Sequence, residues 1–416
     1  MNKTIAILAA LIFITLAACG QSGPRSSADL PGALPVTQPS GVPAALATIP
    51  PPDTSLTGPL VGFYIEDSYE DVYFSLYDAG TGAFRVVQSV TPIYLGEAQW
   101  FDDGCRLFVH GQLVNLHGVV QWSVPPEAAG RIDHINTATL SPERRFIAHV
   151  ISTDQDDATD IEIITLSPPY DAIRLATGGG GPRALAWSAD ENWLYHTEHD
   201  AAGILQVFRA SPDGTTNEKL TSHTTIHTGE VTAITTLSPS PDGRYLAYSV
   251  QNLFQPGQPY AYQPTDEGWV GIIDLAAGTS AAVRPAKFGS AEAGRGLVWD
   301  GAGERLLIIG DSLPVGEDDP DAGRRLLWVT AAGEVTNAIS TADGPGGAEG
   351  HIGWVAPLGS IDTLLVNVLN DYYRYDGDTF QRLDASQAPP LGMELGRRPI
   401  AVLPAPIDFP GEAACD

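Results

Sequence analysis

Basic residues are scarce in this chain. Its 416 residues include 22 Lys and Arg against 50 Asp and Glu, and the formal net charge is −28. This small number of cationic side chains cannot neutralise a nucleic acid backbone or an anionic lipid surface. The composition therefore argues against both as binding partners. A cationic partner is compatible with this charge, and so is the bland alternative of a generally acidic proteome.

The usual signatures of catalysis are also missing. The sequence contains no Gly-x-Ser-x-Gly elbow, no His-Glu-x-x-His and no Walker loop. Gly310-Asp-Ser-Leu313 resembles the nucleophile block of GDSL hydrolases, but only His351 follows it and no Asp stands three residues before that histidine. We interpret residues 310–313 as the end of a strand. We therefore predict no catalytic residue and no cofactor.

A third absence concerns metal sites. His196 and His199 have ligand-type side chains, but at strand spacing they point to opposite faces. Asp154, Asp156 and Asp160 place oxygen ligands at alternating positions that could hold Ca²⁺, although the segment lacks the turn glycine and the bidentate glutamate of an EF-hand loop. A solvated acidic loop is the simpler interpretation. We therefore predict no metal site, and we keep Asp154, Asp156 and Asp160 only as a weak calcium candidate.

The one long apolar run lies at the N-terminus. Lys3 gives a positive start, residues 5–16 are apolar, and Leu16-Ala-Ala-Cys19 closes the segment. This pattern predicts a signal peptide over residues 1–18, too short for a spanning helix. Its ending resembles the lipobox of bacterial lipoproteins, which implies cleavage before Cys19 and a lipid on that cysteine. An ordinary secretory signal with an incidental Cys19 is the alternative.

Residues 19–58 follow as the lipidated cysteine and a Pro/Ser/Ala-rich tether with almost no charge. Such a stretch cannot bury a core. We expect an extracytoplasmic protein held to the bacterial membrane by its N-terminal lipid only, at the outer membrane if the cell is Gram-negative.

The body of the chain repeats. Residues 237–249 read Leu-Ser-Pro-Ser-Pro-Asp-Gly-Arg-Tyr-Leu-Ala-Tyr-Ser, with an apolar pair before a Pro/Asp/Gly turn and an alternating strand after it. Weaker copies begin near residues 99, 139, 185, 297 and 352, and each is followed by a second hairpin. Repetition at this period predicts an all-β propeller.

Counting these hairpins gives seven outer pairs but only six inner ones. Residues 60–65 and 398–403 supply one strand each, so we predict a ring that the N- and C-terminal strands close. Residues 60–403 span 344 positions, or about 49 per blade, against a typical 40–45. Seven blades over residues 59–405 are therefore predicted, with six or eight as alternatives and 406–416 as a C-terminal tail.

The stretch at 237–249 resembles the repeat of WD40-like, TolB-type bacterial β-propellers, and the resemblance covers the chain from about residue 60. It implies a fold rather than an activity, because that family contains scaffolds, binding proteins and the propellers of some peptidases. Trp100, Trp187, Trp299 and Trp354 recur at one inner-strand position. We expect them to fill the wedges between blades rather than to form an aromatic cage.

Two cysteines remain after Cys19. Cys105 falls in a hairpin turn of the second blade and Cys415 is the second-last residue. An even pair in an oxidising compartment permits a disulfide, which would pin the tail to that blade. Two separate thiols are the alternative.

The longest loops carry most of the remaining information. With strands a to d numbered outward, the b–c loops include residues 154–160, 198–200, 251–268 and 312–323 and fall on one face. Recognition usually lies on long loops held by a rigid scaffold. The candidate binding residues on that face are Tyr260, Tyr262, Asp266, Glu267, Asp318, Asp319 and Asp321. Simple tolerance of insertions there is the competing explanation.

These patterns favour a non-catalytic scaffold that binds an unidentified protein or ligand of the cell envelope. Two other classes stay open at this point. One is a propeller enzyme of lyase or hydrolase type, with its site at the central channel. The other is a structural subunit of an envelope complex. The inner strands, on which such an enzyme needs His, Asp or Arg, are mostly apolar.

Overall fold

The protein was analysed as a computed structural model of the whole chain, which divides into Met1–Ala47 and Thr48–Asp416. Every helix and strand named below belongs to the second unit. The structure describes residues 55–67, 72–90, 99–100, 104–109, 111–129, 138–152, 159–176, 184–223, 232–252, 268–285, 288–291, 296–312, 323–340, 343–345, 352–368, 371–384, 387–391, 397–404, 409 and 412–415. Cys19 and the predicted tether up to residue 54 lie outside this part.

The described strands form seven antiparallel sheets. The first three sheets are β29 (Arg397–Pro404), β1 (Leu60–Asp67), β2 (Val72–Asp78), β3 (Phe84–Val90); β4 (Gln99–Trp100), β5 (Arg106–Val109), β6 (Gln112–Asn115), β7 (Val120–Ser123); and β8 (Thr139–Leu140), β9 (Phe146–Ser152), β10 (Thr159–Thr165), β11 (Ala172–Leu175). The fourth and fifth are β12 (Leu185–Trp187), β13 (Leu194–His199), β14 (Leu205–Ala210), β15 (Asn217–Lys219); and β16 (Thr232–Pro239), β17 (Tyr245–Asn252), β18 (Trp269–Asp274), β19 (Thr279–Val283). The last two are β20 (Phe288–Ala291) with β21 (Leu297–Trp299), β22 (Arg305–Ser312), β23 (Gly323–Thr330), β24 (Val335–Ser340); and β25 (Ile352–Ser360), β26 (Thr363–Val368), β27 (Asp371–Tyr375), β28 (Phe380–Arg382). A short helix α1 (Pro126–Ala129) and a 3-10 turn η7 (Glu412–Ala414) complete the described elements.

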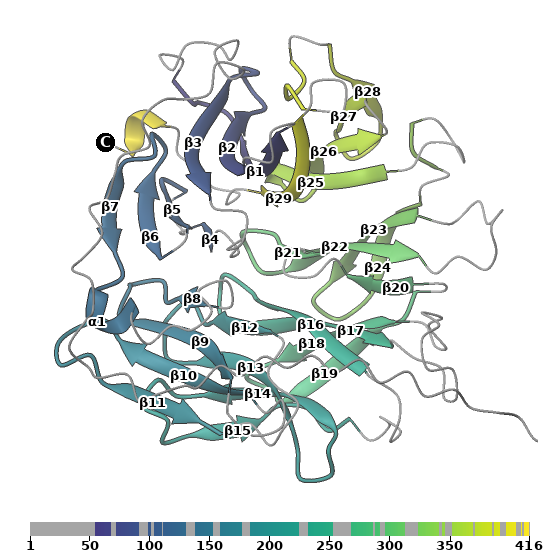
Figure 1. Cartoon of the computed structure of the whole chain (residues 1–416). Coiled ribbons are helices and arrows are strands. Elements are labelled where there is room, and N and C mark those ends of the chain that lie inside the picture. The colour runs from purple at the N-terminus through teal and green to yellow at the C-terminus, as the bar shows by residue number, and fades with distance from the viewer. Residues whose placement is uncertain are drawn as a thin grey trace, which may run out of the picture. The chain divides into compact units, whose positions relative to one another are not determined.

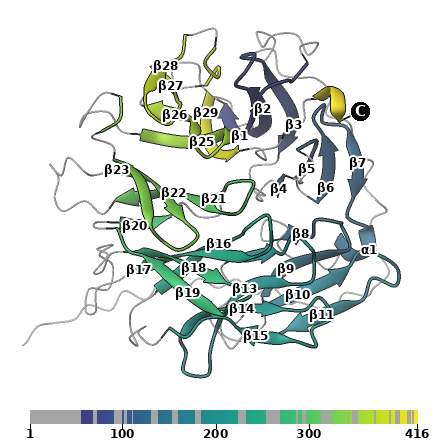
Figure 2. The same cartoon turned by 180° about the vertical axis from the view of Figure 1, so that it is seen from behind.

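The sheets stand around a ring as the blades of a propeller (Figure 1), and the reverse view shows the same order (Figure 2). The first blade is built from both ends of the body, because β1 pairs antiparallel with β29. The predicted seven-bladed all-β propeller and its closure by the terminal strands are therefore confirmed. The segment at 237–249 forms the β16–β17 hairpin of the fifth blade.

Local side-chain hydrogen bonds explain why the repeat turns where it does. In the fifth blade the Ser240 hydroxyl donates to the Asp242 carboxylate at 2.5 Å and accepts the Tyr245 amide at 2.8 Å. Gly243 follows with a φ of 69°, a conformation that side chains disfavour. Ser188 with Asp190 and Ser211 with Asp213 repeat the hydroxyl–carboxylate bond in the fourth blade. The Ser-x-Asp pattern thus sets these hairpins locally.

The core consists of seven apolar clusters, each built from two adjacent blades. The inner-strand tryptophans belong to these junctions, as expected: Trp187 and Trp299 are each 5% exposed and Trp354 is 8% exposed. Trp187 donates its indole N–H to the Thr139 carbonyl and Trp299 to the Ser238 carbonyl, in each case on the inner strand of the preceding blade. These two indoles therefore fill a wedge and satisfy their polar atoms across the junction. The buried indole nitrogen of Trp354 has no hydrogen-bond partner among the described residues.

Strand direction gives the propeller two different ends. Leu60, where the chain enters β1, pairs with Asp78, which begins the turn into β3. We call the end that carries the a–b and c–d turns, such as 240–245 and 78–83, the turn face. The opposite end, with the b–c and d–a connections such as 252–268 and 312–323, is the loop face. The chain therefore enters the propeller on the turn face.

Within the described residues, no helix combines the length and the apolar character that crossing a bilayer needs.

The entry segment is held by a buried carboxylate. Asp78 is fully buried, and its oxygens accept the amides of Thr57 at 2.6 Å and Gly58 at 2.9 Å. Leu56 is fully buried in the junction of blades 1 and 2. Apolar packing and these hydrogen bonds thus hold Leu56, Thr57 and Gly58 against the propeller.

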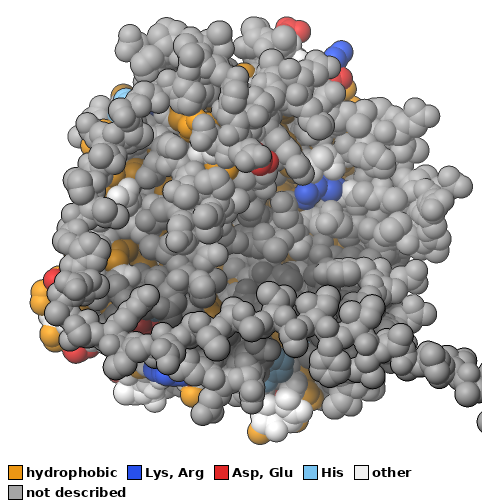
Figure 3. All heavy atoms as spheres, in the orientation of Figure 1, with side chains coloured by type: hydrophobic (Ala, Val, Ile, Leu, Met, Phe, Trp, Pro, Cys, Tyr) orange, Lys and Arg blue, Asp and Glu red, His pale blue; other side chains and the backbone are white. Residues whose placement is uncertain are grey.

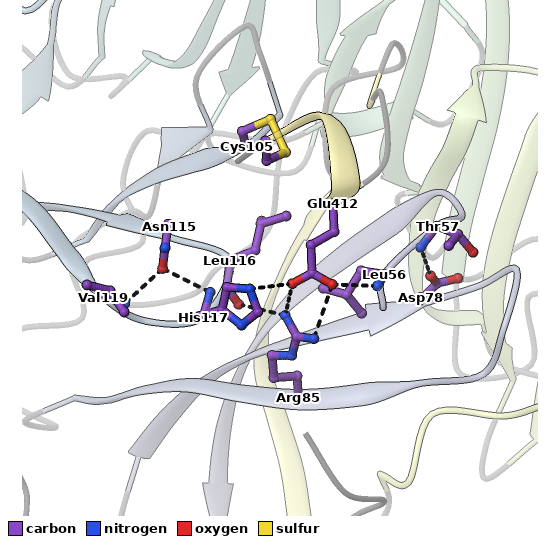
Figure 4. Close-up of polar contacts among 11 residues, drawn as sticks. Leu56, Thr57, Asp78, Arg85, Cys105, Asn115, Leu116, His117, Val119 and Glu412 are labelled. Carbon is purple, nitrogen blue, oxygen red and sulfur yellow. Dashed lines mark hydrogen bonds and ion pairs between the residues drawn. A yellow bond between two sulfur atoms is a disulfide. The ribbon is translucent and has the colours of Figure 1, made fainter. Parts of the chain in front are cut away.

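A terminal clasp, formed by Leu56, Arg85, His117, Glu412 and the Cys105–Cys415 disulfide, joins both ends of the body to blades 1 and 2 (Figure 4). Arg85 from β3 contacts Glu412 through both ends of its guanidinium, and His117 in the β6–β7 turn lies 2.9 Å from the same carboxylate. The Leu56 amide donates to Glu412 at 2.7 Å, while the Glu412 amide donates to the Leu56 carbonyl at 2.8 Å. The tail therefore rests against the point where the tether meets the propeller.

Candidate functional site

Most of the residues singled out on the loop face lie outside the described part of the chain. These are Tyr260, Tyr262, Asp266, Glu267, Asp318, Asp319, Asp321, Asp154 and Asp156. The strands that carry their loops are described, so the structure places the roots of these loops at the loop face. In the orientation of Figure 1, the visible described side chains include both acidic and basic groups (Figure 3).

The acidic residues of this face that the structure does describe each have a partner. Asp160 at the start of β10 accepts from the Arg174 guanidinium at 2.5 Å. Asp200, just after β13, lies 3.3 Å from the Lys219 ammonium group. Within the described residues, no group of three or more His, Cys, Asp or Glu is arranged to hold a metal ion.

Glu198 is a partly buried carboxylate near the end of β13. Burial raises its pKa, a hydrogen bond from Asn217 at 3.1 Å opposes that rise, and the negative charge of Asp160 adds to it. The Oδ1 atom of the same Asn217 accepts a hydrogen bond from His196 Nε2 at 3.1 Å. Asn217 therefore links Glu198 and His196 in one small network at the outer part of blade 4.

The two histidines of the His196–His199 segment do not form a joint site. His196 is fully buried, stacks on Phe208 and has a pKa lowered by burial to about 4, so its ring is neutral at physiological pH. Successive strand residues alternate between faces, so His199 points to the other side of β13. Gly310, Asp311 and Ser312 lie inside β22, paired with Arg325, Arg324 and Gly323. They have the strand context that the sequence predicted rather than a strand–loop–helix turn.

The best-defined cluster on the loop face lies where blades 4 and 5 meet. Trp269 is the first residue of β18 and follows directly on the long connection 253–267. His223 packs edge-on against its indole with ring centroids 5.3 Å apart, and Tyr248 packs edge-on at 5.6 Å. His223 and Tyr248 also contact each other at 5.7 Å. The three rings form a compact aromatic platform at the root of the loop that bears Tyr260 and Tyr262.

A buried amide fixes the position of His223 in this platform. Gln206 on β14 is fully buried, donates to the His223 carbonyl at 3.0 Å and accepts the His223 amide at 2.9 Å. Its oxygen also accepts from the Thr221 hydroxyl at 2.7 Å, and its nitrogen contacts Asp200. With these bonds the amide is fully used, so the backbone of His223 is held firmly beside blade 5.

Arg284 completes the cluster from the end of blade 5. Its guanidinium carbon lies 4.7 Å from the centroid of the Trp269 ring, a cation–π distance. Burial lowers the pKa of His223, and the positive charge of Arg284 lowers it further. At neutral pH the platform therefore carries one positive charge, on Arg284, beside a neutral imidazole.

The sequence did not reveal this cluster. His223 and Arg284 follow β15 and β19, Trp269 begins β18, and all three stand outside the repeated turn. Trp269 does not occupy the inner-strand position shared by the other repeat tryptophans. The sequence indicates only that all three residues lie at strand ends on the loop face. That they contact one another follows only from the packing of blades 4 and 5.

Comparison with known proteins finds only distant structural similarity. No protein-family model and no curated protein matches the chain. Similar solved structures include TolB from Acinetobacter baumannii at 15% identity and a TM-score of 0.43, a match that spans 70% of this chain and 64% of that one. They also include a TolB protein from Agrobacterium tumefaciens, at 15% identity and 0.41 over 69% and 91% of the two chains. The β-propeller domain of Cps50 (Swd1) from Myceliophteria thermophila matches at 12% and 0.45 over 73% and 94%. Identities and TM-scores this low carry no information about activity or partners.

Proposed function

We propose that this protein is a lipid-anchored, extracytoplasmic β-propeller that acts without catalysis as a binding scaffold of the cell envelope. Cys19 carries the lipid, residues 20–54 form the tether, and the loop face binds a protein or another envelope component. The partner meets the loops that bear Tyr260, Tyr262, Asp318 and Asp319.

The observation that carries this proposal is the polarity of the propeller. Leu56 and Gly58 enter on the turn face, where Asp78 and Glu412 hold them. The b–c loops leave from the opposite end of the blades. A chain anchored through its N-terminus thus has its longest loops on the end of the propeller that is remote from its attachment point. Long loops on a rigid scaffold are well suited to recognition.

The anchor is tested by metabolic labelling with a fatty acid in a bacterium that processes lipoproteins. The wild-type chain and a Cys105→Ser variant are expected to incorporate label and to sediment with membranes. A Cys19→Ser variant is expected to lose both properties. Equal labelling of the Cys19→Ser variant would show that this cysteine is not the lipid attachment site.

The binding face is tested by crosslinking in intact cells followed by mass spectrometry. The test variant lacks residues 255–263 and carries Asp→Asn at 318, 319 and 321. The control variant removes three exposed charges from the turn face by Glu304→Gln, Glu334→Gln and Asp378→Asn. We expect a defined crosslinked partner with the wild type and the control, and its loss with the test variant. A partner retained by the test variant but lost from the control would move the binding surface to the turn face.

A further inference from the structure

Seven described arginines of this acidic chain have a carboxylate partner. Ion pairs engage Arg85, Arg145, Arg174, Arg209, Arg244, Arg305 and Arg382. Arg284 differs from them, because among the described residues its contact is with the Trp269 ring and no carboxylate lies within ion-pair distance. In a protein with a net charge of −28, an exposed guanidinium without an acidic partner calls for an explanation.

The geometry of Arg284 leaves its hydrogen-bonding edge available. Stacking on an indole occupies the flat face of a guanidinium, while its five N–H donors lie in the plane at the edge. This edge can receive a carboxylate through two parallel hydrogen bonds, which is the strongest common pairing of this side chain. The contact with the indole also places the guanidinium carbon over the ring before a ligand arrives, which reduces the entropy lost on binding.

The surface beneath Arg284 is rigid and contains an unused polar atom. His223 and Tyr248 hold the indole from two sides, and Gln206 holds the His223 backbone. The Nε2 atom of His223 is buried and has no hydrogen-bond partner among the described residues. A buried polar atom without a partner is unfavourable, so a hydrogen bond from a bound ligand or from a water molecule that it brings would be stabilising.

We propose that Arg284 and Trp269, supported by His223, form a subsite for a single carboxylate of the ligand that binds the loop face. The inference rests on the proposed function and names the chemistry of one of its contacts. The carboxylate pairs with the Arg284 edge, and an apolar neighbour of that carboxylate lies on the exposed part of the indole.

The charge of the whole protein restricts the ligand further. At physiological ionic strength the Debye length is about 8 Å, so most of the net charge is screened at the subsite while contact with Arg284 is not. Acidic loops rooted around the platform still disfavour a strongly acidic partner. A lone carboxylate in an otherwise neutral or basic peptide segment can pair with Arg284 and is repelled little by the acidic residues. A neutral or basic partner also suits the excess of acidic residues in this chain.

The subsite can be tested without knowing the natural partner. The protein is labelled with fluorotryptophan, and the Trp269 signal among the 8 tryptophans is assigned through a Trp269→Phe variant. A capped tripeptide with glutamate between two alanines, its glutamine counterpart and inorganic phosphate are titrated in turn and followed by fluorine NMR. We expect a saturable shift of the Trp269 signal with the glutamate peptide and none with the glutamine peptide.

The matched control is Arg244, which also lies over an aromatic ring, 4.9 Å from the centroid of Tyr245, but at the turn face. Arg284→Gln should weaken the glutamate peptide about tenfold or more, as expected for loss of a charge-assisted pair, and Arg244→Gln should leave its affinity unchanged. An equal response to glutamine, equal binding by Arg284→Gln, or a stronger response to phosphate would overturn the carboxylate subsite. Because the probe is a defined peptide, such a failure leaves the crosslinking test of the loop face unaffected.

Discussion

Tyr248 shows how a single residue shapes the candidate site. Its register partner on β18 is Gly271, and the phenol ring lies across that glycine on its way to Trp269 and His223. A Cβ atom at residue 271 would lie 2.1 Å from the Tyr248 ring carbon Cζ. The absence of a side chain at 271 is therefore what lets the ring lie flat on the strand, and the platform at the blade 4–5 junction depends on it.

Gly271→Ala is expected to destabilise the protein by about 1–3 kcal/mol, because the buried ring has to move out of a close-packed junction. Urea unfolding followed by tryptophan fluorescence should show a lower midpoint with an unchanged slope. The same substitution in a Tyr248→Leu background should cost much less. Equal costs in the two backgrounds would mean that the ring contact is not the cause.

At the scale of elements, the terminal clasp ties η7 to β3 and to the β6–β7 turn. Burial alone raises the pKa of Glu412, but hydrogen bonds from Arg85 and the Leu56 amide, with the charges of Arg85 and His117, outweigh burial and hold that pKa below its ordinary value. A carboxylate whose folded pKa is depressed stabilises the protein above its unfolded pKa of 4.5 and loses that effect as the pH falls through the folded pKa.

Glu412→Gln is expected to lower the free energy of unfolding at pH 7 by about 3–5 kcal/mol, because it leaves the 8% exposed Arg85 without its anionic partner. The difference in the free energy of unfolding between wild type and variant should shrink as the pH falls from 4.5 through the lower folded pKa of Glu412, because the wild-type carboxylate then loses its charge. Denaturant unfolding across pH 3–7 measures both effects. Asp371→Asn, which breaks the exposed pair with Arg382, is the control and should have a much smaller effect on stability. Similar costs for the two variants would contradict the role of the clasp.

At the scale of the whole molecule, two links between distant parts of the sequence hold the ring closed. The β1–β29 ladder joins residues 60–67 to residues 397–404. The Cys105–Cys415 disulfide joins the second blade to the tail across 310 positions. The pairing with β29 covers an edge of β1 to which another chain could otherwise bind. The disulfide limits the conformational freedom of the unfolded chain.

Replacing both cysteines by Cys105→Ser and Cys415→Ser should lower the free energy of unfolding by about 2–5 kcal/mol, as for other native disulfides. Adding reductant to the wild-type protein should reproduce this loss, and it should leave the double variant unchanged. A Cys19→Ser variant serves as the control for loss of a cysteine elsewhere. A wild-type midpoint that does not respond to reductant would show that the bond does not contribute to stability in solution.

Much of the architecture could be predicted because it depends on neighbours in the sequence. The Ser-Pro-Asp-Gly turn at 240–243 forms its own hydrogen bonds, and the strand after it is buried on both faces over residues 246–250. Repeating that unit gave the blade count, and the unmatched apolar ends gave the closing pair β1–β29. The tryptophans followed the same repeat, so their burial at the junctions was also expected.

The sequence by itself thus determined the fold class, the number of blades and the candidate cysteine pair, because periodic patterns and turn chemistry act over a few residues. Only the tertiary structure decided which side chains meet. Arg85 reaches Glu412 across 327 positions, and His223, Trp269 and Arg284 meet only because blades 4 and 5 pack side by side. Contacts of this kind depend on how the blades pack against one another, and no pattern within a single repeat records that packing.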